Sequence, residues 1–113
     1  MLKHSNRDGV DIVELNGQLN MACAGEVRAQ LLNIIEQGSH KLVMDFGAVE
    51  FVDSSGLSVI ISAYKRIASK AGKMALSNLP KNVQALFALT RMNEAFQVFA
   101  DTSAAVEFLK SDA

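Results

Sequence analysis

Strand-like and helix-like patterns alternate along almost the whole chain, and this alternation restricts the possible folds more than any other feature. Short apolar, β-branched runs indicate strands, and apolar residues spaced three and four apart indicate helices. Strands are predicted over residues 10–15, 41–46, 73–77 and 96–99, and helices over about 22–37, about 55–71, from Pro80 onward and over 101–110. Parallel strands need long crossover connections, which helices supply. We therefore expect an α/β fold with a mostly parallel central sheet of about four to five strands and about four helices.

Local signals refine this order. The turn residues Asp8 and Gly9 predict an additional edge strand upstream of the first one. Gly17 is expected to end the strand at 10–15, which would place residues 17–20 in a loop. Gly38 is expected to end the helix at about 22–37. The run at 41–46 is mostly apolar, as in a central strand covered on both faces. Short connections throughout predict one domain over residues 1–113.

The composition excludes several classes of function. The 113 residues are half apolar, with a formal charge of −1 and a pI near 6.1, which leaves no basic excess for nucleic acid or for an anionic membrane surface. The first seven residues are too polar for a signal peptide, and no apolar run approaches the roughly 20 residues that span a bilayer. We expect a cytoplasmic protein with no membrane insertion and no nucleic-acid partner.

The residues that usually carry chemistry do not form an active-site pattern. No glycine-rich phosphate loop occurs, and the single cysteine, Cys23, lacks partners for a disulfide or a metal site. His4 and His40 are interpreted as surface residues, and strand-end and loop solvation explains the acidic residues at 45–53. We therefore expect no cofactor, no metal and no enzymatic activity, which is the profile of a binding module.

The most informative segment is Asp-Ser-Ser-Gly-Leu at residues 53–57, at the start of the most regular amphipathic pattern. The predicted buried stripe of this helix is Leu57, Ile60, Ile61, Tyr64, Ile67 and Ala68. Aspartate and serine before a helix accept hydrogen bonds from its free N–H groups, so simple helix capping explains the triplet by itself. A phosphate on one of these serines would meet the same N–H donors and the positive end of the helix dipole.

The order of elements and this motif together resemble the STAS family, specifically the stand-alone anti-sigma factor antagonists of bacteria. The resemblance covers nearly the full length of the chain. It is carried by the Gly-x-Leu loop at 17–19, the strand from Lys41, the motif at 53–57, the turn containing Gly72, the helix start at Pro80, and Leu-Phe at 86–87.

The resemblance implies a partner switch. The unphosphorylated form would bind a serine kinase of the histidine-kinase-like ATPase superfamily, often an anti-sigma factor, and so free the sigma factor. That kinase would phosphorylate the antagonist, and a metal-dependent PPM-type serine phosphatase would reverse the step. The phosphorylated serine of the family corresponds to Ser55, with Ser54 as second choice. The residues expected to contact a partner are Asn20, Asp53, Ser54, Ser55, Gly56, Ser58, Val59 and Ser62, of which 55, 58, 59 and 62 are expected on the exposed side of the helix.

Position 20 departs from the family pattern. Many members carry aspartate there, near the phosphorylation site, where it helps to engage the kinase. Asn20 keeps the size and the hydrogen bonding but removes the charge. A kinase contact that depends on that carboxylate would be weakened or differently paired.

Two other interpretations stay open at this point. STAS-like domains also serve as non-switching scaffold subunits of signalling assemblies or as accessory subunits of lipid transporters, although the intact pair of serines at 54 and 55 favours the switch. An enzyme would need a pocket that the sequence does not assemble. The resemblance names no particular sigma factor, kinase or phosphatase, and it is compatible with a monomer or a weak dimer.

Overall fold

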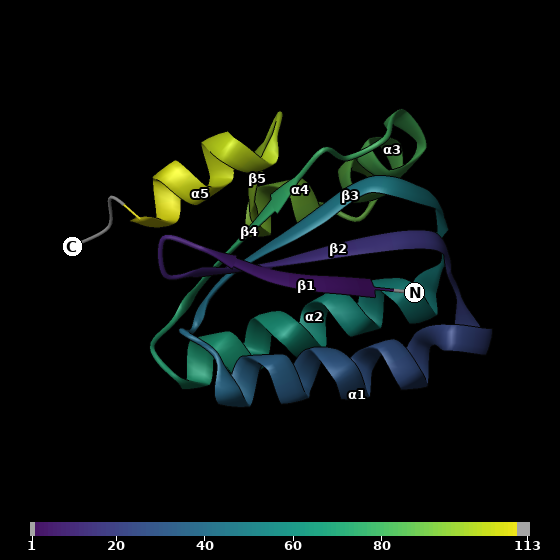
Figure 1. Cartoon of the computed structure of the whole chain (residues 1–113). Coiled ribbons are helices and arrows are strands. Elements are labelled where there is room, and N and C mark those ends of the chain that lie inside the picture. Colours follow the sequence, from purple (N-terminus) through teal and green to yellow (C-terminus); the bar gives the residue numbers. More distant parts are fainter. Residues whose placement is uncertain (1, 111–113) are drawn as a thin grey trace.

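A five-stranded sheet forms the centre of the computed structural model, which describes residues 2–110 (Figure 1). The strands are β1 (Leu2–Arg7), β2 (Val10–Leu19), β3 (Lys41–Val52), β4 (Lys73–Ser77) and β5 (Gln97–Phe99). The helices are α1 (Met21–Gln37), α2 (Ser54–Ser69), α3 (Lys81–Leu89), α4 (Met92–Ala95) and α5 (Thr102–Lys110). The strands lie in sequence order, and β1 pairs antiparallel at one edge while the other pairs are parallel. The predicted fold class is confirmed; the ends of the predicted domain, residues 1 and 111–113, lie outside the described residues.

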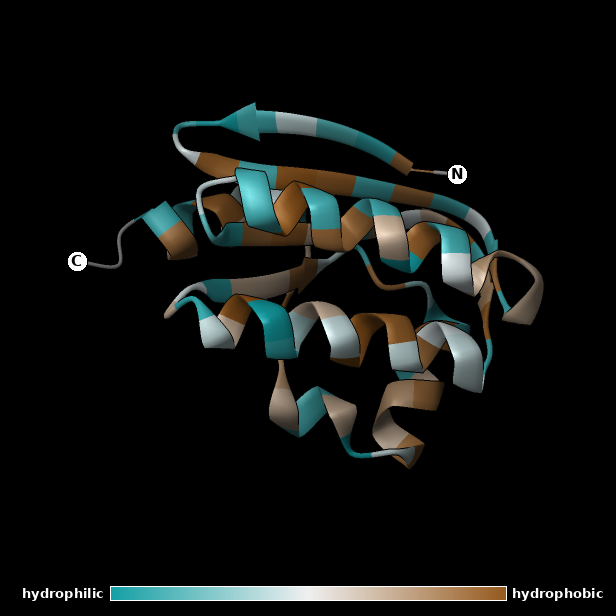
Figure 2. Cartoon of the chain, turned by 90° about the horizontal axis from the view of Figure 1, so that it is seen from below, coloured by the Kyte–Doolittle hydropathy of each residue, from teal (hydrophilic) through white to brown (hydrophobic). Residues whose placement is uncertain are grey.

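Helices cover both faces of this sheet. α1 and α2 lie side by side on one face, and α5 covers the other (Figures 1 and 2). The alternating side chains of β3 follow this division, because Leu42, Met44 and Phe46 are buried in the main core, whereas Val43 is buried in a smaller core with Val106 of α5. The prediction of a central strand buried on both faces is confirmed.

Two strands, β2 and β3, are longer than predicted. Gly17 has a φ of +77° and lies at an irregularity in the register between them, so it bends β2 without ending it. β2 continues to Leu19 and β3 to Val52, and these two residues are register partners. The expected loop is therefore wrong for residues 17–19. The longer strands reach the point at which α1 and α2 begin.

The buried side of α2 differs from the predicted stripe. Its buried residues are Gly56, Val59, Ile60, Ala63 and Ile67. Ile61, Tyr64 and Ala68, which were predicted inside, are exposed, and Tyr64 packs edge-on against Phe96 with ring centroids 5.2 Å apart. The small residues Gly56 and Ala63 occupy the line of closest contact with the rest of the core, and larger apolar side chains flank it. Residue size, as well as apolar character, decides which side of this helix is buried.

Val59 is consequently not a surface residue. Its side chain is 2% exposed and packs in the main core, so the expectation that it lies on the exposed side of the helix is wrong. Ser58 beside it is exposed, and Ser62 is half-buried. These two serines retain the accessible position that was predicted for them.

The last part of the described chain follows the predicted order, with one addition. α3 begins after Pro80 and buries Val83 and Phe87, and α5 buries Val106 as expected. The four-residue α4 was not predicted, because one turn is too short to show a helical period. Within residues 2–110, no helix has both the length and the apolar character needed to cross a bilayer.

Candidate functional site

Two helices begin side by side at the carboxyl ends of β2 and β3. Leu19 and Val52 are paired across the strands, and each helix starts two residues further on, α1 at Met21 and α2 at Ser54. The first turn of a helix carries free N–H groups and the positive end of its dipole. Two such ends therefore meet at one end of the sheet, which we call the junction (residues 19–21 and 52–56).

Asp53 holds the junction together. Its Oδ1 accepts a hydrogen bond from the N–H of Gly56, 3.0 Å away in the first turn of α2. Its Oδ2 accepts one from the N–H of Met21, 3.2 Å away at the start of α1. Its own N–H donates to the carbonyl oxygen of Leu19 at 3.2 Å. One carboxylate thus caps two helices, so the capping role that the sequence suggested is present and joins two segments that are far apart in the chain.

Asn20 caps α1 from the other side of the junction. Its Oδ1 accepts a hydrogen bond from the N–H of Ala22 at 3.0 Å, and its Nδ2 donates to Oε1 of Gln18 at 3.3 Å. Aspartate would accept the first bond and has no hydrogen to donate for the second when ionised. With asparagine at this position, Asp53 is the one carboxylate within the junction.

Gly56 is the point at which α2 comes closest to the end of β2. A Cβ placed there would lie 2.4 Å from the carbonyl oxygen of Leu19 and 2.9 Å from a methyl carbon of Val52, and real Cβ atoms do not make contacts that short. Because Gly56 is also buried, we assign it a packing role, and its contact with a partner stays a prediction. Its close packing fixes the position of its neighbour Ser55.

The serines of α2 lie next to one another along one side of the helix. Ser54 is exposed, Ser55 is half-buried, and the hydroxyl of Ser58 donates to the carbonyl oxygen of Ser54 at 3.1 Å. The hydroxyl of Ser62 accepts a hydrogen bond of 3.3 Å from Nε of Arg28, which belongs to α1. The predicted serines are therefore brought together, and α1 contributes a cation beside them.

A hollow of about 370 Å³ lies between α1 and α2 next to these serines. The residues that line it are Ala24, Gly25 and Arg28 of α1 and Ser55, Ser58, Val59 and Ser62 of α2. A Cβ at Gly25 would meet nothing within 4 Å. The hollow is thus open to additional atoms, and Arg28 is the one charged side chain in its lining.

Sequence reasoning missed both Arg28 and Gly25. A basic residue beside a buried position such as Val27 is indistinguishable in sequence from an ordinary solvated side chain, and only the packing of two helices places it opposite Ser62. Glycine inside a helix is unfavourable by about 1 kcal/mol relative to alanine. That cost is the one signal in the sequence that points to position 25.

Exposed apolar side chains flank the junction, and these were also missed. Met21 is 78% exposed at the start of α1, and Phe51, just before the junction, is 48% exposed. Phe51 and Leu89, which is 84% exposed, line a second hollow of about 250 Å³. Leu89 does not lie on the same side of α3 as the buried Val83. Its position in the helical period was therefore the sequence signal for an exposed apolar residue. Large apolar side chains exposed close together are typical of interaction surfaces.

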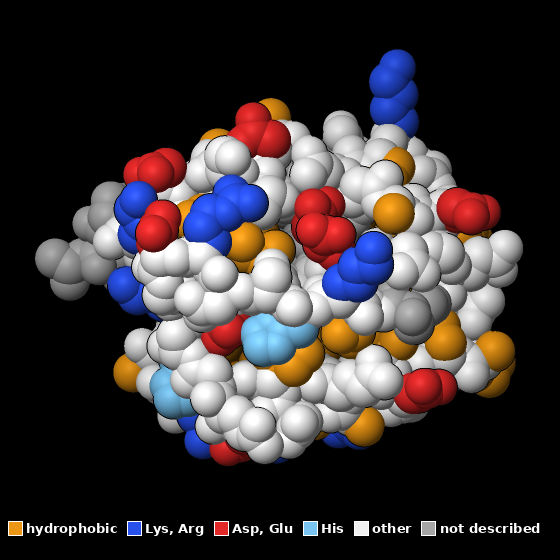
Figure 3. Space-filling view, in the orientation of Figure 1, with side chains coloured by type: hydrophobic (Ala, Val, Ile, Leu, Met, Phe, Trp, Pro, Cys, Tyr) orange, Lys and Arg blue, Asp and Glu red, His pale blue; other side chains and the backbone are white. Residues whose placement is uncertain are grey.

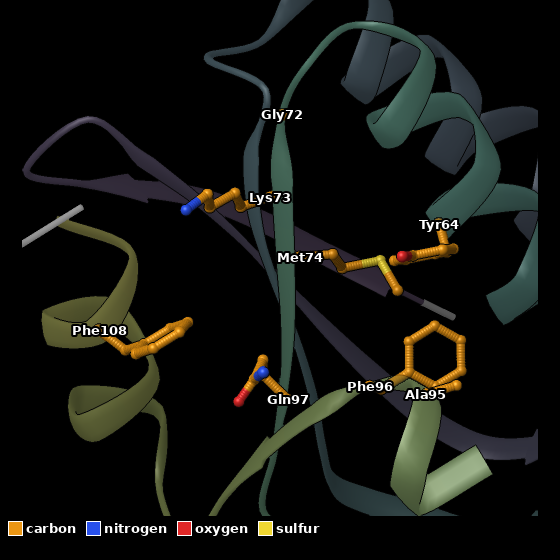
Figure 4. Close-up of a pocket in the computed structure, with 8 residues that line it drawn as sticks. All are labelled: Tyr64, Gly72, Lys73, Met74, Ala95, Phe96, Gln97 and Phe108. Carbon is orange, nitrogen blue, oxygen red and sulfur yellow. The ribbon is translucent and has the colours of Figure 1, made fainter. Parts of the chain in front are cut away.

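Other parts of the described chain lack a comparable arrangement of functional groups. Within residues 2–110, no three His, Cys, Asp or Glu side chains are placed to hold a metal ion. Acidic and basic side chains lie interspersed on the face shown in Figure 3. The hollow in Figure 4 lies beside β4, toward the C-terminal end of α2, and Tyr64 and Phe96 pack edge-on at one of its walls.

Comparison with known protein families matches residues 3–105 to the STAS domain. The chain belongs to the STAS domain family. The resemblance inferred from the motif at 53–57 and from the order of elements is therefore confirmed.

Named relatives of this STAS chain match most of its length. It is 32% identical over 92 residues to the anti-sigma F factor antagonist of Paenibacillus polymyxa, which covers 80% of this chain and 79% of the relative. It is 28% identical over 104 residues to BtrV of Bordetella bronchiseptica, a candidate anti-sigma factor antagonist, covering 92% and 90%. The crystal structure of a candidate anti-sigma factor antagonist from Thermotoga maritima has a TM-score of 0.91 at 25% identity, covering 96% and 94%.

Proposed function

We propose that this STAS domain is an anti-sigma factor antagonist that acts by partner switching. Its unphosphorylated form binds a serine kinase of the histidine-kinase-like ATPase superfamily that also serves as an anti-sigma factor, and the sigma factor is thereby freed. The kinase phosphorylates Ser55, which ends the complex, and a PPM-type phosphatase restores the serine. The domain works in the cytoplasm and catalyses no reaction itself. The names of its relatives and the extent of the match support the general role.

The observation that carries the proposal is the position of Ser55 in the first turn of α2, at the junction with α1. A phosphate there lies at the positive end of the helix dipole, so phosphorylation is compatible with the folded domain. Ser54 occupies the same turn and is more exposed, which keeps it as the second choice. The half-buried Ser55 lines the hollow between α1 and α2, where a partner side chain can reach it.

Phosphorylation changes the charge of this surface sharply. A phosphate adds about −1.5 to −2 charge next to the carboxylate of Asp53. A partner that buries the neutral hydroxyl of Ser55 would have to desolvate a second, larger anion in the phosphorylated complex. A loss of about 4 kcal/mol in binding free energy corresponds to roughly a thousandfold weaker complex. That loss is large enough to separate the partners at cellular concentrations.

The partner surface in this proposal combines polar and apolar contacts. Asn20, Asp53 and Ser58 lie at or near its centre, and the exposed side chains of Met21 and Phe51 lie beside them. Protein interfaces commonly place large apolar and aromatic side chains among polar groups, and a few of those side chains dominate the affinity. The apolar residues therefore supply binding energy, and the serine controls whether it is available.

Intact-mass analysis after incubation with ATP and the candidate kinase of the same genome tests this proposal. We expect one added phosphate on the wild-type chain and on Ser54→Ala, and none on Ser55→Ala. If only Ser54→Ala lacks the phosphate, the phosphorylated residue is Ser54. If no variant gains a phosphate from a kinase that is active on another substrate, the switch fails for that pair, and a non-switching scaffold or transporter subunit becomes the better account.

A further inference from the structure

Arg28 is a cation of α1 that lies beside the serines of α2. Its Nε donates to the hydroxyl of Ser62, and both side chains lie near the surface. In the described part of the chain, the ion pairs involve other residues, so Arg28 has no carboxylate partner there. A single neutral hydrogen bond leaves most of the donors of a guanidinium group available.

The hollow beside Arg28 also has room for an anion. Gly25 forms part of its wall, and a Cβ at that position would meet nothing within 4 Å. Glycine is among the least favourable residues inside a helix, yet no neighbour within the chain requires it here. Because Ser55 lines the same hollow, a group attached to its hydroxyl can enter this space.

We propose that Arg28 binds the phosphate of phosphorylated Ser55 across this hollow, exchanging the hydroxyl of Ser62 for the phosphate oxygens. The inference rests on the proposed phosphorylation of Ser55 and adds the residue that binds the phosphate. α1 and α2 both run away from the junction, and helical side chains lean toward the N-terminal end of their helix (Figure 1). In the unphosphorylated structure the Nε of Arg28 contacts Ser62, about two helical turns along α2 from Ser55, so the exchange includes a change of the Arg28 rotamer toward the junction.

This contact would make the phosphorylated state a defined structure instead of a freely moving charge. A guanidinium group binds phosphate through two parallel N–H···O bonds, which are stronger than a neutral hydrogen bond to a hydroxyl. The phosphate would then fill the hollow between α1 and α2 and close it to a partner side chain. Phosphorylation would thus block the surface by occupancy as well as by charge.

The test places phosphoserine at position 55 during translation, so it does not depend on any kinase. A ³¹P NMR titration then gives the pKa of the phosphoserine in the folded domain, and a bound guanidinium lowers that pKa. We expect Arg28→Gln to raise it by about 0.5 and Arg28→Lys to raise it by less. Lys65→Gln is the matched control, because Lys65 is an exposed cation of α2 outside the lining of this hollow. It should leave the pKa unchanged.

A second measurement follows Arg28 itself. Its Nε–H resonance should move when Ser55 is phosphorylated, and should move as well in Ser62→Ala, which lacks the present acceptor. Equal phosphoserine pKa values in wild type and Arg28→Gln would overturn the inference, as would a rise in Lys65→Gln as large as that in Arg28→Gln. If Arg28→Gln raises the phosphoserine pKa but a kinase assay finds no phosphate on Ser55, the proposed function is overturned and this inference is not.

Discussion

The carboxylate of Asp53 accepts a hydrogen bond from the backbone N–H of Met21, 3.2 Å away and 32 positions earlier in the chain. Its other oxygen caps α2 through the N–H of Gly56. One side chain therefore sets the positions of two helix starts relative to each other, and the serine that we propose as the switch lies between them. Changes at Asp53 should affect both the stability of the domain and the geometry of the site.

Replacing Asp53 by alanine should cost more stability than replacing an ordinary cap. Asp101 is the matched control, because its Oδ1 accepts one bond from the N–H of Ala104 at the start of α5. We expect Asp53→Ala to lower the free energy of unfolding by about 2 kcal/mol and Asp101→Ala by about 1 kcal/mol, measured by urea denaturation. Equal losses would show that the bond to Met21 contributes nothing.

Two glycines in helices should respond to alanine in opposite directions. Gly56→Ala drives a methyl group into the carbonyl oxygen of Leu19 and should lower the free energy of unfolding by about 1–3 kcal/mol. Gly25→Ala meets no neighbour and should raise it by up to about 1 kcal/mol. Thermal or urea unfolding of both variants checks this pair, and a stabilised Gly56→Ala would contradict the close packing at the junction.

Acid stability should depend on Asp11, a carboxylate that is 5% exposed between β1 and the loop after α1. Burial alone would raise the pKa of Asp11, but hydrogen bonds from His4, from the N–H and hydroxyl of Ser39 and from Asn6 outweigh it and hold the pKa below the ordinary value of 3.8. A group whose pKa is lowered by folding stabilises the protein above the unfolded pKa. That contribution is lost as the pH falls through the folded pKa.

Urea unfolding of wild type and Asp11→Asn at pH 6 and pH 3 measures this dependence. Asn keeps the shape of the side chain and cannot ionise, so the variant should be less stable than wild type at pH 6. The difference should begin to shrink toward pH 3, because the Asp11 carboxylate of the unfolded chain takes up its proton before that of the folded chain. Two pH profiles that remain parallel over this range would contradict the role assigned to Asp11.

The exposed apolar residues near the junction should matter for binding and not for folding. Leu89→Ala should change the free energy of unfolding by less than about 0.5 kcal/mol, because the side chain is 84% exposed. The same variant should weaken binding to the cognate kinase by about tenfold, as loss of a buried apolar contact would. Val98→Ala, an exposed apolar position on β5, is the control that should leave the affinity unchanged.

The sequence predicted the layers of this fold because local patterns determine them. The alternation of short apolar runs with helical periods identified a parallel sheet, and the apolar run from Leu42 to Phe46 identified a strand covered on both faces. Gly17 was misinterpreted because a glycine with positive φ can mark either a turn or a bulge within a strand. The buried side of α2 was misassigned because Tyr64 is more apolar than Gly56 but too large for the line of closest contact.

The site was predictable from the sequence only in part, because some of its contacts join segments that are distant in the chain. The Asp-Ser-Ser-Gly motif located the start of α2, since caps and serines act on backbone a few residues away. The bond from Met21 to Asp53 and the approach of Arg28 to Ser62 join segments more than 30 residues apart, and no periodicity reports such contacts. Val59 lies among serines in the sequence, and only the packing of the folded chain shows that its side chain is buried.

The most direct test of the switch compares the affinity of the cognate kinase for the chain with serine and with phosphoserine at position 55. Isothermal titration calorimetry at physiological salt, with ADP bound to the kinase so that no transfer occurs, gives both dissociation constants. The account predicts that phosphoserine weakens the complex by roughly a thousandfold, which is about 4 kcal/mol. Equal dissociation constants for the two forms would contradict it.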